Sequence, residues 1–313
     1  MKILISGAAG FLGSLLAKQL VSDGHVVYGT TRSSCTKNLD SIIRKKNFSL
    51  IKLDLKDFGD YYHDRLRYCK LPSVDIVFHL ASQQPLSDSV KFENYFEGNL
   101  VPTINLLNYY QNKNLKLFVF TSTTSVLSGQ NRPLTERTKV LLPLHNYALT
   151  KYMSELAVKN SAEKSPFKTA ILRLPSLCGP SNIGGIVHYY YSQAINDKDI
   201  NVFFEGKQLR NIMHVDSFIE VCKKLILNQN KLKKYELFLI GSKNSIKTKQ
   251  LAELVIKKTR SKSKINFSTL ETPHNKDIVI DCSKAQSRGI LSPISTQTAI
   301  SRYINEMSTN KNV

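Results

Sequence analysis

The stretch Gly7-Ala-Ala-Gly10-Phe-Leu-Gly13 decides how the first part of this 313-residue chain folds. It directly follows the apolar run Lys2–Ser6, which is typical of a buried strand, and it opens Phe11–Asp23, whose leucines recur at helical spacing. Glycine lets the backbone approach a ligand closely, and a helix N-terminus offers unpaired N–H groups and a positive dipole end to an anion. The context predicts a site for the pyrophosphate of a dinucleotide, although tight packing of helix on sheet would also explain the glycines.

Further apolar runs alternate with helical segments along the first half of the chain. Near-continuous apolar strands of this kind are buried on both faces of a parallel sheet, and their crossovers are right-handed. The chain is therefore predicted to be an α/β protein with a Rossmann-like, doubly wound parallel sheet. The expected strands are His25–Thr31, Phe48–Leu53, Val74–Leu80, Leu115–Ser122 and Phe167–Leu174, and the clearest helices are Glu93–Gln111 and His145–Glu163.

The pattern loosens after Leu174, where prolines and glycines between Pro175 and Gly185 indicate a long loop. We predict a dinucleotide-binding domain over residues 1–174. Residues 175–313 are predicted to form mainly a smaller α/β substrate lobe over the carboxyl ends of the sheet, with some chain returning to the first domain. The expected elements of this lobe are helices near Ile186–Ile195, Ser217–Asn228, Thr248–Thr259 and Thr296–Met307 and strands at Tyr235–Ile240 and Ile278–Asp281.

Composition restricts the partners. The chain has 44 Lys and Arg against 24 Asp and Glu, a net charge of +20. The lysines are not interleaved with aromatic residues as in a single-strand binding groove, so we interpret them as a solvated surface and expect no nucleic-acid partner. The five cysteines contain no C-x-x-C pair, which argues against a disulfide framework or a metal site and favours the cytoplasm. No apolar run reaches the roughly 18 residues that a membrane span requires.

The second strand ends in Thr31-Arg32-Ser33 without an acidic residue. An acid there would bind the ribose 2′-hydroxyl of NAD, whereas Arg32 suits a 2′-phosphate, so NADP(H) is favoured and NAD(H) is the alternative. Asp54 after the third strand could accept a hydrogen bond from the adenine amino group.

Tyr147 and Lys151 lie four residues apart, on one face of the helix that follows the fifth strand. An ammonium near a phenol lowers the pKa of the phenol, which would make Tyr147 a usable acid and base. The fifth strand ends in hydroxyl residues, of which Thr123 is the first choice for a hydrogen bond to the substrate oxygen and Ser122 the second. These hydroxyls could also serve only the turn.

With these motifs in order, the chain resembles the extended short-chain dehydrogenase/reductases of the NAD-dependent epimerase/dehydratase family. The matching segments are GAAGFLG at Gly7–Gly13, Asp54-Leu55, HLAS at His79–Ser82, Asn99, STTSV at Ser122–Val126, YALTK at Tyr147–Lys151, LRLPSLCGP at Leu172–Pro180, Arg210–Asp216 and Asp281–Ala285. His79 lies in an apolar run and is interpreted as a hydrogen-bonded core histidine rather than a catalyst.

The resemblance implies a catalytic set of Thr123, Tyr147 and Lys151. It implies a nucleotide-diphosphate sugar as substrate, with Arg210 on the diphosphate and Ser176 and His188 as further substrate contacts. The predicted cofactor-binding residues are Gly7, Gly10, Phe11, Leu12, Gly13, Arg32, Asp54, Leu55, Leu80, Ala81, Ser82, Asn99, Ser122, Tyr147, Lys151 and Pro175. The two long helices commonly pair with a second subunit in this family, so a homodimer is expected.

Several activities fit these residues. The favoured activity is that of a 4-keto reductase, because Arg32 suits NADPH and NADPH usually serves net reduction. A 4-epimerase or 4-dehydrogenase with retained NAD needs the same side chains. A reductase of a non-sugar carbonyl and a non-catalytic NADP-sensing protein are the remaining hypotheses. The 4,6-dehydratases of the family carry Asp-Glu after the catalytic threonine, whereas this chain has Thr124 and Ser125, which argues against a dehydratase.

Overall fold

The computed structural model describes residues 1–58, 71–85, 90–130, 132–141, 143, 145–269 and 277–309. The chain divides into two compact units. The first unit consists of Met1–Thr123, His145–Leu172 and Leu225–Leu237, and the second of Thr124–Leu144, Arg173–Lys224 and Phe238–Val313. Each unit is thus assembled from three separate stretches, whereas the proposed division into domains after residue 174 stays a prediction.

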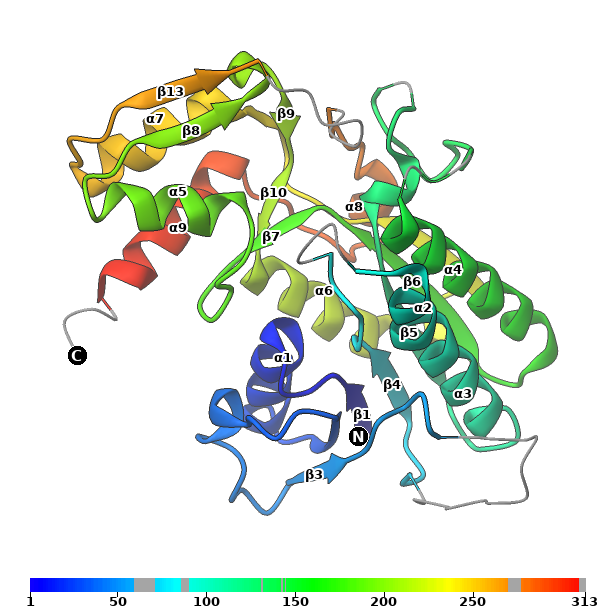
Figure 1. Ribbon diagram of the computed structural model, residues 1–313. Coiled ribbons are helices and arrows are strands. Elements are labelled where there is room, and N and C mark those ends of the chain that lie inside the picture. Colours follow the sequence, from blue (N-terminus) through cyan, green and yellow to red (C-terminus); the bar gives the residue numbers. More distant parts are fainter. Residues whose placement is uncertain are drawn as a thin grey trace. The chain divides into compact units, whose positions relative to one another are not determined.

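The main sheet has seven strands in the order β11-β6-β5-β4-β1-β2-β3 (Figure 1). β1 pairs in parallel with β2 and β4, β2 with β3, and β4 with β5. This order confirms the predicted doubly wound sheet, and it reverses direction between β1 and β4, the position where ligands of such sheets bind. The strands are β1 (Lys2–Ser6), β2 (Val26–Thr31), β3 (Phe48–Lys52), β4 (Ile76–His79), β5 (Leu117–Thr123), β6 (Lys168–Leu174) and β11 (Tyr235–Leu239).

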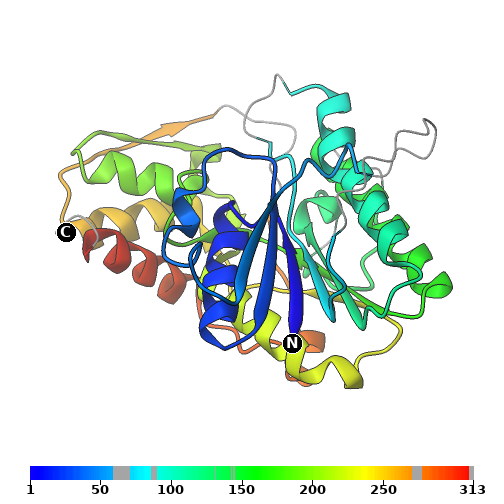
Figure 2. The same ribbon diagram turned by 90° about the horizontal axis from the view of Figure 1, so that it is seen from below.

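Helices cover both faces of the sheet in the first unit. Figure 2 shows α1 (Phe11–Ser22) on one face, and α3 (Val101–Tyr110) and α4 (Asn146–Lys164) on the other. Leu4, Val77 and Phe118 from the strands pack with Val158 of α4 in one buried apolar cluster. Burial on both faces explains why the strands read as continuous apolar runs.

The predicted helix Glu93–Gln111 is interrupted by a wider turn. It consists of α2 (Phe92–Tyr95), a π-helical segment η2 (Phe96–Leu100) and α3. Pro102 follows this segment and has no N–H to donate to the carbonyl four residues earlier, which is compatible with the wider turn. π-helical turns often occur at functional sites, and this one contains Asn99.

The second unit contains short elements that the sequence pattern did not reveal. β7 (Ser176–Cys178) lies inside the stretch predicted as a loop and pairs with β10 (Ile212–His214). β8 (Ile200–Phe203) pairs with β13 (Ile265–Ser268), and β9 (Leu209–Arg210) with β12 (Ile246–Lys247). The strand predicted at Ile278–Asp281 is wrong, because only an isolated bridge links Ile280 to Leu134. The helices are α5 (Ile186–Ala194), α6 (Val215–Asn228), α7 (Thr248–Thr259), α8 (Ser283–Ser287) and α9 (Thr296–Thr309), and 3-10 turns occur at Lys37–Leu39, Thr124–Leu127, Phe204–Gly206 and Gln229–Lys231.

An apolar cluster of the second unit holds α5, α7 and α9 together. Tyr191 and Tyr303 meet edge to face with ring centroids 5.7 Å apart, and Leu251 of α7 is buried in the same cluster. Among the described residues, no helix combines the length and apolar character that crossing a bilayer requires.

We expect Gly13→Ala to destabilise the protein. An added Cβ at Gly13 would lie 2.2 Å from the carbonyl oxygen of Gly7, and overpacking of this kind costs about 3 kcal/mol. At Gly10 the nearest heavy atom would be 3.2 Å away, so Gly10→Ala should cost less than about 1 kcal/mol. Urea unfolding of both variants measures the difference. Equal losses of unfolding free energy would show that the Gly7–Gly13 packing is not what restricts this position.

Candidate active site

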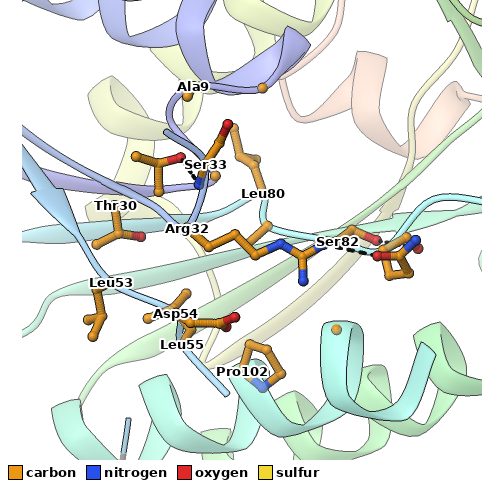
Figure 3. A pocket seen from close by; sticks show the side chains of 16 residues that line it. Ala9, Thr30, Arg32, Ser33, Leu53, Asp54, Leu55, Leu80, Ser82 and Pro102 are labelled. Atoms are coloured by element: carbon orange, nitrogen blue, oxygen red, sulfur yellow. Dashed lines mark hydrogen bonds between the residues drawn. The ribbon is translucent and has the colours of Figure 1, made fainter. Parts of the chain in front are cut away.

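A pocket lies at the carboxyl ends of β1, β2, β3 and β4, at the position where the strand order reverses (Figure 3). Its volume is about 300 Å³, which suits part of a dinucleotide-sized ligand. The lining residues are Gly7, Ala9, Gly10, Thr30, Thr31, Arg32, Ser33, Leu53, Asp54, Leu55, Leu80, Ala81, Ser82, Gln83, Gly98 and Pro102. The pocket thus brings together most of the predicted cofactor residues that follow the first four strands.

The glycine loop forms the inner wall of the pocket. Gly7 has φ +71°, and a Cβ at this residue would lie 2.9 Å from the Cα of Ala81. Gly10 precedes α1 without a side-chain cap, so the first N–H groups of the helix, including those of Phe11 and Leu12, have no side-chain acceptor there. These observations fit a pyrophosphate bound by backbone N–H groups.

A buried network fixes the loop after β4. The hydroxyl of Ser6 lies 2.6 Å from Nδ1 of His79 and accepts hydrogen bonds from the backbone N–H groups of Leu80 and Ala81. Nε2 of His79 lies 2.9 Å from the hydroxyl of Thr103, and burial lowers the pKa of His79 to about 3. His79 is therefore a neutral, hydrogen-bonded core histidine, which confirms the interpretation made from the sequence.

Asn99 connects that loop to the helix that follows the fifth strand. Its Oδ1 accepts hydrogen bonds from the Ser82 hydroxyl and the Gln83 backbone N–H, both at 2.8 Å. Its Nδ2 donates to the hydroxyl of Thr150 at 3.0 Å. Thr150 belongs to α4, the helix that carries Tyr147. One buried carboxamide therefore links the pocket wall to that helix by hydrogen bonds.

Tyr147 has side-chain hydrogen bonds to Gln84, Ser82 and Thr123. Since Ser82 also lines the pocket, the phenol adjoins it. Burial raises the pKa of Tyr147 to about 12, and the three hydrogen bonds oppose this shift without cancelling it. The expected lowering of the phenol pKa is therefore wrong for this structure, because desolvation of the phenolate exceeds the stabilisation that its neighbours provide.

Lys151 is almost completely buried beside β5. Its Nζ lies 4.1 Å from the ring centroid of Phe120, and its side chain is 2% exposed. Burial lowers the pKa of Lys151 to about 7, although the charge of Glu155 opposes the shift. Ser122, two residues after Phe120, is also buried, and within the described ranges its hydroxyl has no hydrogen-bond partner.

The remaining predicted residues belong to the second unit. Pro175 precedes β7 and Ser176 begins it, with an exposed side chain. Nδ1 of His188 in α5 lies 2.9 Å from the hydroxyl of Tyr303. Arg210 ends β9, and burial lowers the pKa of its guanidinium while Tyr190 and Asp277 oppose the shift. The roles predicted for these residues stay predictions.

Two neighbouring glutamines of the site were missed from the sequence. Gln83 lines the pocket, where its Oε1 accepts a hydrogen bond from Nη2 of Arg32 at 3.0 Å, and Gln84 is hydrogen-bonded to Tyr147. They directly follow His79–Ser82, so extending that motif by two residues would have found them. Asp54, in contrast, lines the pocket as expected, and its Oδ1 accepts a hydrogen bond from the backbone of Lys56 at 3.1 Å.

Comparison with known proteins identifies the class. Residues 3–241 match the NAD dependent epimerase/dehydratase family, and the chain belongs to this family of enzymes. A UDP-glucuronate 4-epimerase of Thermodesulfobacterium geofontis is 26% identical over 314 residues, covering 96% of this chain and 94% of the relative. An uncharacterized UDP-glucose epimerase of Bacillus subtilis is 30% identical over 233 residues, covering 70% and 71%.

A solved structure has the same fold over nearly the whole chain. The UDP-glucuronic acid 4-epimerase of Bacillus cereus, in complex with UDP-glucuronic acid and NAD, superimposes with a TM-score of 0.83 at 25% identity. The match covers 98% of this chain and 100% of that one. Family membership and the Rossmann-like fold are thus confirmed, whereas the expected preference for NADP(H) receives no support from this NAD complex.

The low pKa of Lys151 predicts a pH-dependent stability. The pKa is about 7 in the folded protein and 10.5 in the unfolded chain, so the unfolded chain binds more protons between these values. The free energy of unfolding should therefore rise as the pH increases from 7 towards 10.5. Lys151→Met should lack this rise, and Lys164→Met, an exposed control on the same helix, should retain it. Urea unfolding at several pH values tests the comparison, and parallel curves for the wild type and Lys151→Met would contradict it.

Proposed function

We propose that the protein is a 4-epimerase of a nucleotide-diphosphate sugar that retains NAD through the reaction. The observation that carries this proposal is the hydrogen bonding of Tyr147 to Ser82, a wall residue of the dinucleotide pocket, and to Thr123 at the end of β5. An acid-base phenol beside a dinucleotide pocket suits hydride chemistry at a carbinol carbon. The UDP-sugar epimerases among the relatives support C4 of a UDP-sugar as the reacting position.

The side chains divide the work as follows. Thr123 hydrogen-bonds the C4 oxygen, and Tyr147 takes its proton at Oη and later returns it. The glycine loop Gly7–Gly13 and the other pocket residues would hold NAD, which would supply the hydride acceptor and donor. Lys151, buried on the same helix, favours the phenolate whenever it is protonated. Asn99 keeps Ser82 in place, so the pocket wall and the phenol stay in a fixed relation.

Substrate contacts are proposed for Ser176, His188 and Arg210, with Pro175 beside the cofactor. The planar guanidinium of Arg210 suits a diphosphate. Its predominantly buried environment would strengthen such a contact, since a buried cation gains more from an anion than an exposed one does.

A homodimer is also proposed. Phe96, Ile104 and Leu156 lie on η2, α3 and α4 and are 37%, 38% and 49% exposed. α3 and α4 pack on each other, and these apolar side chains suit burial against a second copy.

A 4-keto reductase that uses NADPH is the second candidate. Arg32 favours it, because no acidic residue ends β2 to bind a ribose 2′-hydroxyl. The hydrogen bond from Arg32 to Gln83 gives this arginine another role, and the NAD complex of the relative favours the epimerase. Thr124 and Ser125 still argue against a dehydratase.

Tyr147→Phe is expected to abolish interconversion of the two C4 epimers, with a loss of at least about 100-fold in turnover. It should still bind the dinucleotide, because the glycine loop is unchanged. Tyr152→Phe, one position after Lys151 on α4, is the matched control and should retain activity. Purified protein is incubated with a panel of UDP-sugars without added cofactor, and the products are resolved by NMR. Full activity of Tyr147→Phe would refute the mechanism.

The cofactor that stays with the protein separates the two candidates. Mass spectrometry of the small molecules released by denaturing the purified protein should show NAD⁺ or NADH for the epimerase. Release of no dinucleotide, together with consumption of added NADPH by a 4-keto sugar, would instead establish the reductase.

A further inference from the structure

Arg32 and Gln83 join two walls of the dinucleotide pocket. Arg32 follows β2 and Gln83 lies four residues after β4, and Nη2 of Arg32 donates to Oε1 of Gln83 at 3.0 Å. Both residues line the pocket, and Figure 3 shows Arg32 extending from its own wall towards the segment that contains Ser82. The hydrogen bond therefore spans the pocket rather than reinforcing one wall.

The strand order defines what this hydrogen bond crosses. β1 lies between β2 and β4, and neighbouring strands are about 4.8 Å apart. The two side chains thus cover roughly 10 Å and pass over the carboxyl end of β1. The glycine loop Gly7–Gly13 begins at that end, and Gly7, Ala9 and Gly10 line the same pocket as Arg32 and Gln83.

The two ends of the pair are anchored. The backbone N–H of Gln83 donates to Asn99, and a Cβ at Gly98 would lie 2.6 Å from the Cβ of Gln83, so the stem of Gln83 packs on the bare backbone of Gly98. On the other wall, the N–H of Ser33 donates to the hydroxyl of Thr31 at 3.1 Å. The Arg32 side chain itself is exposed, and its hydrogen bond to Gln83 holds it across the pocket.

The chemistry of the pair suits a phosphate oxygen. Gln83 is a neutral acceptor and uses only part of the guanidinium, which has five N–H donors. This hydrogen bond leaves the positive charge of Arg32 in place. The N–H groups that Gln83 does not use can donate to an anion. A 2′-phosphate, in contrast, would compete with Gln83 for the guanidinium.

We propose that Arg32 and Gln83 form a strap across the dinucleotide pocket that slows release of the cofactor between turnovers. This inference rests on the proposed function, because a 4-epimerase must keep the same dinucleotide through oxidation and reduction. Arg32 then helps to retain the cofactor and does not bind a 2′-phosphate. That no acidic residue ends β2 therefore does not indicate a preference for NADP over NAD.

The test is the rate at which bound NADH leaves the protein, followed by stopped-flow fluorescence after displacement with excess NAD⁺. Gln83→Met keeps the packed stem but removes the amide, and it should release NADH at least about tenfold faster, as expected for loss of a hydrogen bond to a charged group. Arg32→Met should release it at least as fast. The double variant should be no faster than Arg32→Met, because the two residues act as one unit.

Controls separate the strap from general charge and from the proposed reaction. Arg44→Met removes an exposed positive charge outside the pocket and should leave the NADH release rate unchanged. Release of NADH from Gln83→Met at the wild-type rate, or additive effects in the double variant, would overturn the proposal. If Arg32→Met accelerates NADPH release only, Arg32 binds a 2′-phosphate and the strap is refuted. The measurement needs no sugar, so a failure to epimerise any substrate leaves it interpretable.

Discussion

The geometry of the site depends on the hydrogen bonds of the Asn99 carboxamide. Its oxygen holds the hydroxyl of Ser82 and the backbone of Gln83, while its nitrogen holds Thr150 on α4. A buried amide that satisfies three groups is costly to disturb, because each group left unpaired would bear a desolvation penalty. Asn99 is hydrogen-bonded both to the pocket wall and to the helix that carries the Tyr147 phenol. The distance between wall and phenol is therefore fixed.

The fold can be predicted from the sequence where a local pattern determines the structure. The strands, the glycine loop and the helix that carries Tyr147 and Lys151 lie where the sequence predicts them. Strand burial, loop geometry and helical periodicity each depend on residues that are neighbours in the sequence. The short strands β7 to β10 were not found. Pairs such as β8 with β13 join residues 65 positions apart, and two to four residues carry too little periodicity to show their partner.

The pKa values of the site depend on burial in the fold rather than on the spacing of residues in the motif. The spacing of four from Tyr147 to Lys151 suggests a phenol acidified by an ammonium, but burial raises the pKa of the tyrosine and lowers that of the lysine. Desolvation acts on both groups and depends on everything packed around them. The contacts of Gln83 and Gln84 were hidden for a similar reason, since their partners Arg32 and Tyr147 lie on other segments.

The discontinuous first unit has a consequence for biosynthesis. β11 neighbours β6 in the main sheet, yet it is synthesised more than sixty residues later. While the ribosome is still translating the intervening stretch, β6 presents an open edge with unpaired backbone groups, a template for pairing with other nascent chains. Synthesis must pass residue 239 before that edge can be covered, so the nascent chain is exposed to misassembly while the residues between Leu174 and Tyr235 are being made.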